Sequence, residues 1–311
     1  MRDWKRVVLG ILALALLALG VRLPEWALFL AIVALAKGLV VLGLMVLWRA
    51  GLVSFGQGLF YGLGAYSVGL LPIYWNITDA FALVGAGTLV ALAVAFIIGF
   101  LLAQYREIFF AMLCLAFSMI LYGILVKSET LGSTDGFNIV SVSYAGYTPA
   151  PGLATNIALY ALTAAIVALA GLLVARYLGS TLGHLATAIR DNEIRVEYLG
   201  FSVRRALHFK FALAGALAGA GGALTAIAIG HIDPEMAWWI TSGEFVFVTM
   251  LSGAGSVIAP FLGSLAFELL RSYALQYAPN VWQIIVGGAL LLVILFLPGG
   301  LWSLIDRRKP A

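Results

Sequence analysis

The chain has 311 residues, of which 63% are hydrophobic and only 10% are charged, with a formal net charge of +4. Soluble domains carry about a quarter charged residues, so this chain cannot cover a water-exposed surface, and we expect an integral membrane protein. The single cysteine, Cys114, lies in an apolar run, where a small buried hydrophobe is its expected role. The three histidines are far apart and no Walker-type phosphate loop is present, so we expect no metal, cofactor or ATP site.

Apolar runs of membrane length predict an all-α, polytopic protein with about ten transmembrane helices, so that residues 1–311 form one transmembrane domain. In chain order, the expected spans are 7–22, 26–48, 57–75, 80–102, 108–126, 156–176, 209–230, 241–258, 261–277 and 281–298. The first span could be a signal peptide, because a basic segment precedes it. No small-residue cleavage site follows, however, so we expect an uncleaved anchor.

Ten spans place both ends of the chain on the same side of the membrane. That side receives most of the 18 Lys and Arg residues, while the opposite side receives mainly acidic residues. The positive-inside rule therefore predicts that both termini are cytoplasmic. The basic residues do not gather on a soluble domain, so no nucleic-acid partner is expected.

Two connections are long. The outer loop, residues 127–155, is rich in Ser, Thr, Gly and Pro and should be irregular. The inner loop, residues 177–208, has apolar residues at helical spacing; Asp191 or Asn192 can then cap a second short helix, and Gly200 can end it. This charged helix–break–helix pattern favours a protein-docking role over a connector that lies on the lipid surface.

The stretch GLVSFGQGLFYGLGAYSVGLL, residues 51–71, is apolar but rich in glycine, the residue that weakens a helix most after proline. At helical spacing its small residues form one stripe, which consists of Gly51, Ser54, Gly58, Gly62, Ala65 and Gly69. Gly56 and Gly64 fall on another face, so two neighbouring helices can approach closely. Glycine-interrupted helices with polar groups are tolerated at membrane depth where they line a cavity, so Ser54 and Gln57 indicate a transport pathway.

Residues 252–256, SGAGS, precede Pro260 and have the same broken character. The candidate pathway residues are therefore Ser54, Gln57, Gly58, Gly62, Glu244, Ser252 and Gly253. A further stripe of small residues follows the inner loop and consists of Gly215, Gly219, Gly222, Ala226 and Gly230. Ordinary tight helix packing explains this second stripe as well as any functional role does.

Charged residues inside spans are costly in lipid and are functional candidates. Glu268 and Arg271 are three positions apart on one expected helix, so a structural ion pair between them is the better interpretation. Lys37 could reach the membrane surface or pair, and Glu244 should face water near the outer end of its span.

Several stretches resemble, in order along the chain, the LivM-type permease subunits of branched-chain amino acid ABC importers. They are GLVSFGQGLFYGLGAY, YREIFFAMLCLAFSMI with the later STDGF, LATAIRDNEIRVEYLGFSVRRALHFKFALAGALAGAGGAL, LSGAGSVIAPFLGSLAFELL and LFLPGGLW. The resemblance covers nearly everything after about residue 30. The sequence departs from the family pattern at Glu107 and Ser252, where the family favours glycine, and at Val248, where it favours methionine.

The resemblance implies a non-enzymatic permease in the bacterial or archaeal cell (inner) membrane, in contact with lipid. A second homologous permease subunit would complete the pathway, two cytoplasmic ATP-binding subunits would drive it, and an external solute-binding protein would deliver amino acids. The loop at 180–200 would dock on an ATPase through Arg190, Asp191, Asn192, Glu193 and Gly200. The alternatives are an importer of the same family for urea, short amides or another small polar solute, and a stand-alone ion-coupled secondary transporter.

Overall fold

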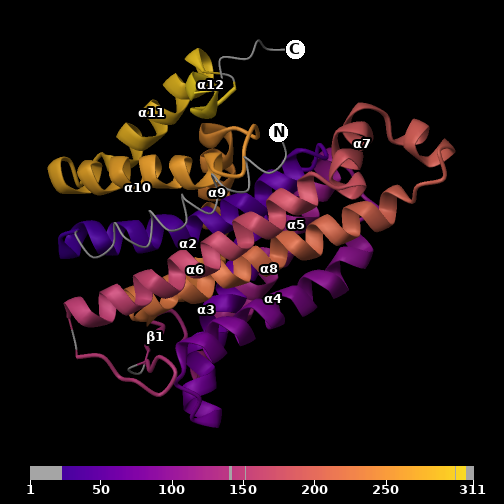
Figure 1. Ribbon diagram of the computed structural model, residues 1–311. Coiled ribbons are helices and arrows are strands. Elements are labelled where there is room, and N and C mark those ends of the chain that lie inside the picture. Colours follow the sequence, from indigo (N-terminus) through magenta and orange to yellow (C-terminus); the bar gives the residue numbers. More distant parts are fainter. Residues whose placement is uncertain (1–22, 140–141, 151, 298, 306–311) are drawn as a thin grey trace.

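The computed structural model describes residues 23–139, 142–150, 152–297 and 299–305, which form a bundle of long helices (Figure 1). The α-helices are α2 (Glu25–Trp48), α3 (Gln57–Trp75), α4 (Ala80–Leu102), α5 (Glu107–Lys127), α6 (Leu153–Leu178), α7 (Thr181–Tyr198), α8 (Val203–Ile229), α9 (Trp239–Ser252), α10 (Ala259–Tyr277), α11 (Trp282–Phe296) and α12 (Trp302–Ile305). The short elements are the 3-10 helices η1 (Glu129–Leu131) and η2 (Pro234–Ala237) and the strands β1 (Phe137–Asn138) and β2 (His231–Ile232).

The prediction of an all-helical, polytopic membrane protein is confirmed. Five of the helices in the described part of the chain, α2, α4, α5, α6 and α8, are long and apolar enough to cross a membrane. The expected span 7–22 lies outside the described residues. The expected span 241–258 runs too far, because α9 ends at Ser252 and Gly253 adopts a left-handed φ of 79°.

Helices α2, α3 and α8 form the centre of the bundle, and α8 contacts α2, α3 and α4 along its length. The contact depends on glycine. A methyl carbon built on Gly64 of α3 would lie 2.7 Å from the carbonyl carbon of Gly219 in α8, and one built on Gly87 of α4 would lie 2.9 Å from the carbonyl oxygen of Gly64. Backbones therefore touch directly, as small residues permit between membrane helices. This confirms close packing on the Gly64 face and in the second stripe from Gly215 to Gly222, whereas Gly230 follows the end of α8 and a methyl carbon there would meet nothing within 4 Å.

The single helical stripe expected from Gly51 to Gly69 is wrong at its beginning. Residues 49–56 form a loop, because Gly51 has a left-handed φ of 78° and α3 begins only at Gln57. The remaining glycines of the stripe do lie on one face of α3. Methyl carbons built on Gly58 and Gly62 would contact the Ser242 hydroxyl and Ala237, respectively.

The partner of this α3 face is mainly the irregular segment 230–238 between α8 and α9, which contains only the short elements β2 and η2, together with the first turn of α9. Gly69 faces Ile232 at one end of the segment, and Gly58 faces Ser242 just beyond the other end. Gly58 and Gly69 are about 16 Å apart along the axis of α3. Irregular backbone at membrane depth must be buried in protein and hydrogen-bonded. The hydroxyl of Ser118 in α5 donates such a bond to the carbonyl of Ala237 at 2.7 Å.

The outer loop is largely irregular in its described part, as expected. Its strand β1 pairs with β2 in antiparallel fashion, with Phe137 opposite Ile232. The outer loop is thereby attached to the start of the irregular segment.

Candidate docking loop and broken helices

The inner loop folds as a helix with a break, as its sequence predicts. Ser180 caps the first turn of α7, and Asn192 leaves the helical conformation with φ −165° and ψ 101°. The side-chain carbonyl of Asn192 accepts a hydrogen bond from the backbone N–H of Arg195 at 2.9 Å, which caps the second segment. Gly200, with φ 86°, follows the end of that segment.

The expected docking residues contact their own chain more than the sequence suggested. Glu193 forms an ion pair with Arg106 in the connection between α4 and α5, at 2.8 Å. Arg190 packs over the backbone of Gly51. Arg190 and Asp191 are both exposed and Glu193 is half-buried, so the Glu193–Arg106 ion pair and the contact of Arg190 with Gly51 hold α7 in place.

The second segment of α7 and the residue after it expose three large apolar side chains, next to the exposed charged residues Arg195 and Glu197. Ile194, Tyr198 and Leu199 are 63%, 88% and 71% exposed. Sequence reasoning missed this surface, although the spacing of Ile194 and Tyr198 by four positions indicates one helix face.

The first turn of α7 is anchored by Lys210, a completely buried residue of α8. Its ammonium donates to the Tyr177 hydroxyl at 2.7 Å and to the Leu182 carbonyl at 3.0 Å. Lys210 therefore connects α6, α7 and α8.

The expected pathway residues are buried or half-buried within the protein. Ser54 and Gln57 are fully buried and Ser252 is 1% exposed. The Ser54 hydroxyl accepts a bond from the Gly56 N–H at 3.3 Å, and the Gly58 N–H donates to the Ser242 hydroxyl at 2.8 Å. These groups fix the loop 49–56 and the start of α3 against α9.

The charged residues within helices are brought together, but not as expected. Lys37 of α2 pairs with Glu268 of α10 at 2.6 Å, and Arg271 of α10 pairs with Glu244 of α9 at 3.2 Å. The expected Glu268–Arg271 pair is therefore wrong, and Glu244, whose side chain is 23% exposed, pairs with Arg271. Each acidic side chain pairs with a basic side chain on a neighbouring helix. The two ion pairs therefore link α10 to α2 and to α9.

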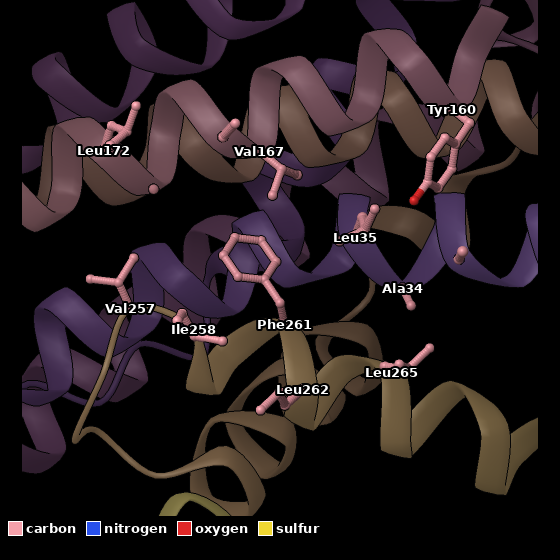
Figure 2. A pocket seen from close by; sticks show the side chains of 13 residues that line it. Ala34, Leu35, Tyr160, Val167, Leu172, Val257, Ile258, Phe261, Leu262 and Leu265 are labelled. Carbon is pink, nitrogen blue, oxygen red and sulfur yellow. The ribbon is translucent and has the colours of Figure 1, made fainter. Parts of the chain in front are cut away.

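A cavity of about 170 Å³ lies between α2, α6 and α10. Figure 2 shows Phe261 of α10 directed toward Val167 of α6, with Leu35 of α2 nearby and the Tyr160 hydroxyl at one end. No charged side chain is among its lining residues, so the cavity does not match the charges of a free amino acid.

Long apolar helices in direct backbone contact, with ion pairs between neighbouring helices, define a polytopic helical membrane protein. The family model described as branched-chain amino acid transport system / permease component matches residues 26–295, so the chain belongs to this family. It is a permease component and not a catalytic subunit.

Two relatives share the name "High-affinity branched-chain amino acid transport system permease protein LivM". They come from Escherichia coli (strain K12) and Salmonella typhimurium (strain LT2). Each is 28% identical over 290 residues, which covers 84% of this chain and 67% of the relative. No solved structure gives a significant match. The resemblance found in the sequence is confirmed, and the chain is a permease subunit of an ABC importer.

Proposed function

We propose that the chain carries branched-chain amino acids across the cell inner membrane together with a second, homologous permease subunit. Two cytoplasmic ATP-binding subunits drive the cycle, and an external solute-binding protein supplies the solute. The names of the two relatives, both branched-chain amino acid permeases, support this solute class. Ten spans with both termini in the cytoplasm complete the proposal, and they place the loop 177–208 on the ATPase side and the loop 127–155 outside.

The exposed apolar surface of α7 carries the proposal of ATPase docking. An apolar surface on a loop outside the lipid indicates a protein partner. Ile194 and Tyr198 provide the contact area, with Asp191 as a charged group beside it. Arg190, Asn192, Glu193 and Gly200 act indirectly, because they set the angle and position of the two segments of α7.

We also propose that the expected pathway residues act on the pathway indirectly, by supporting the backbone segments that line it. They support the irregular segment 230–238 and the break at 253–258, and they comprise Ser54, Gln57, Gly58, Gly62, Glu244, Ser252 and Gly253. Discontinuous helices near the membrane midplane are the usual place for solute contacts in transporters, which supports this role.

The docking role is tested with Tyr198→Ala in the complete importer. We expect less ATP-binding subunit to co-purify with the variant and uptake to fall, because a large exposed aromatic contact is removed. Tyr147→Ala is the matched control, since Tyr147 is 68% exposed on the outer loop. Equal co-purification with both variants would contradict docking through α7. Uptake of labelled leucine that isoleucine and valine inhibit, but urea does not, tests the solute class.

A further inference from the structure

The loop 49–56 lies where three parts of the molecule meet. At its start, Arg49 donates hydrogen bonds to the carbonyl of Ala254, from Nε at 3.0 Å and from Nη2 at 2.7 Å. Nη2 also reaches the carbonyl of Gly255 at 3.3 Å. Both carbonyls belong to the break between α9 and α10. A guanidinium can hold two carbonyls at once because its donors form a planar fork.

The same loop supports α7. A methyl carbon built on Gly51 would lie 3.4 Å from Cγ of Arg190, which directly precedes the break region of α7. The end of α2 accordingly lies beside α7 (Figure 1). Further along the loop, a methyl carbon on Gly56 would lie 2.7 Å from the carbonyl oxygen of Cys114 in α5. The loop therefore contacts α7, α5 and the break between α9 and α10.

The connection between Arg190 and Ala254 is short and stiff. The N–H groups of Ala50 and Gly51 donate to the carbonyls of Leu47 and Trp48, each at 2.9 Å, so the turn is hydrogen-bonded to the end of α2. Only one residue separates Gly51 from Arg49. A displacement of α7 that presses on Gly51 must therefore move the Arg49 side chain or break these bonds.

The receiving end is an interruption of regular helix structure. Gly253 has a left-handed φ of 79°, and α10 begins only at Ala259. Breaks of this kind absorb backbone rotation where a regular helix resists it.

We infer that Arg49 is a positioning residue that transmits movement of α7 to the break between α9 and α10, and so couples ATPase docking to the pathway. This inference rests on the proposed docking role of α7. It assigns the Arg49 guanidinium to the carbonyls of Ala254 and Gly255 and requires no contact between Arg49 and the solute.

The test uses the complete importer in liposomes with its solute-binding protein, and it measures solute transported per ATP hydrolysed. Arg49→Gln removes the fork and the charge. We expect the ratio to fall about tenfold, the change in an equilibrium when a charge-assisted hydrogen bond is lost. ATP hydrolysis and co-purification of the ATP-binding subunits should stay within about twofold. Arg204→Gln is the matched control, because Arg204 also donates to a backbone carbonyl, that of Phe100 at 3.1 Å, outside the loop and the break. It should keep the ratio.

A purely structural role would reduce yield, hydrolysis and uptake in proportion and leave the ratio unchanged, which would overturn the inference. Arg49→Lys keeps the charge and one donor, so it should recover part of the ratio. If Arg49→Gln does not assemble, Arg49→Lys decides: a reduced ratio supports the inference, and the wild-type ratio overturns it. Failure of the docking role itself is recognised separately, by full co-purification of the ATP-binding subunits with Tyr198→Ala.

Discussion

Replacing Gly64 by alanine should destabilise the protein, although alanine is the better helix former. The added methyl carbon would lie 2.7 Å from the carbonyl carbon and 2.8 Å from Cα of Gly219, both backbone atoms that no rotamer change can move. Ordinary contact begins near 3.4 Å, and the carbonyl oxygen of Gly219 would lie closer still to the added carbon, so α3 and α8 must separate locally by more than about 0.7 Å. A gap of that size removes roughly a quarter to a half of the dispersion energy at the contact.

Overpacking of this kind costs about 1–3 kcal/mol, and the backbone clash places Gly64→Ala near the upper limit. The helix-propensity gain of roughly 1 kcal/mol offsets part of the cost. We expect a net loss of about 2 kcal/mol and a melting temperature lowered by roughly 4 °C or more.

Thermal unfolding of the purified protein in detergent checks this prediction against Gly123→Ala. Gly123 also lies inside a helix, α5, but a methyl carbon there would meet nothing within 4 Å. That control should be neutral or slightly stabilised. Equal melting temperatures for the two variants would refute the backbone contact between α3 and α8.

Three further outcomes are expected. Lys37→Met leaves Glu268 unpaired and should cost roughly 3 kcal/mol, whereas the double variant Lys37→Met/Glu268→Gln should recover most of the loss; melting curves that show no recovery would argue against the ion pair. Glu107→Gly should raise the free energy of unfolding by about 1 kcal/mol, because Glu107 has a φ of 48°; an equal gain for Glu25→Gly, the first-turn acid of α2, would exclude relief of backbone strain as the cause. Single cysteines at Thr134 and Ser202, in a Cys114→Ala background, should react with impermeant reagents from opposite sides of the membrane, and reaction from the same side would disprove the ten-span topology.

The sequence predicts the helices well because membrane length and apolar composition are local properties. It also predicts the break in α7, since the cap at Asn192 and the stop at Gly200 depend on nearby residues alone. The Glu268–Arg271 pair was predicted wrongly because spacing along one helix says nothing about which helix lies beside it. Glu268 has Arg271 on its own helix and still pairs with Lys37, 231 positions away.

The loop 49–56 illustrates a second limit. Gly51 and Ser54 fit helical spacing, and only the left-handed backbone at Gly51 excludes them from α3. Glycine permits that conformation without requiring it. Likewise, the role of Gly58 and Gly62 as contacts was predictable, but their partner, an irregular segment more than 170 positions away, was not.

The central place of α8 has a consequence for the order in which the protein is made. Helices α2, α3 and α4 leave the ribosome well before α8, so the faces that receive it, including Gly64 and Gly87, stand without their partner in the newly inserted chain. Lipid cannot replace the backbone contacts that α8 makes there. A nascent chain stopped before residue 203 therefore contains most of the membrane segments but lacks the one around which they pack, and the membrane's quality-control proteases should recognise it as incomplete.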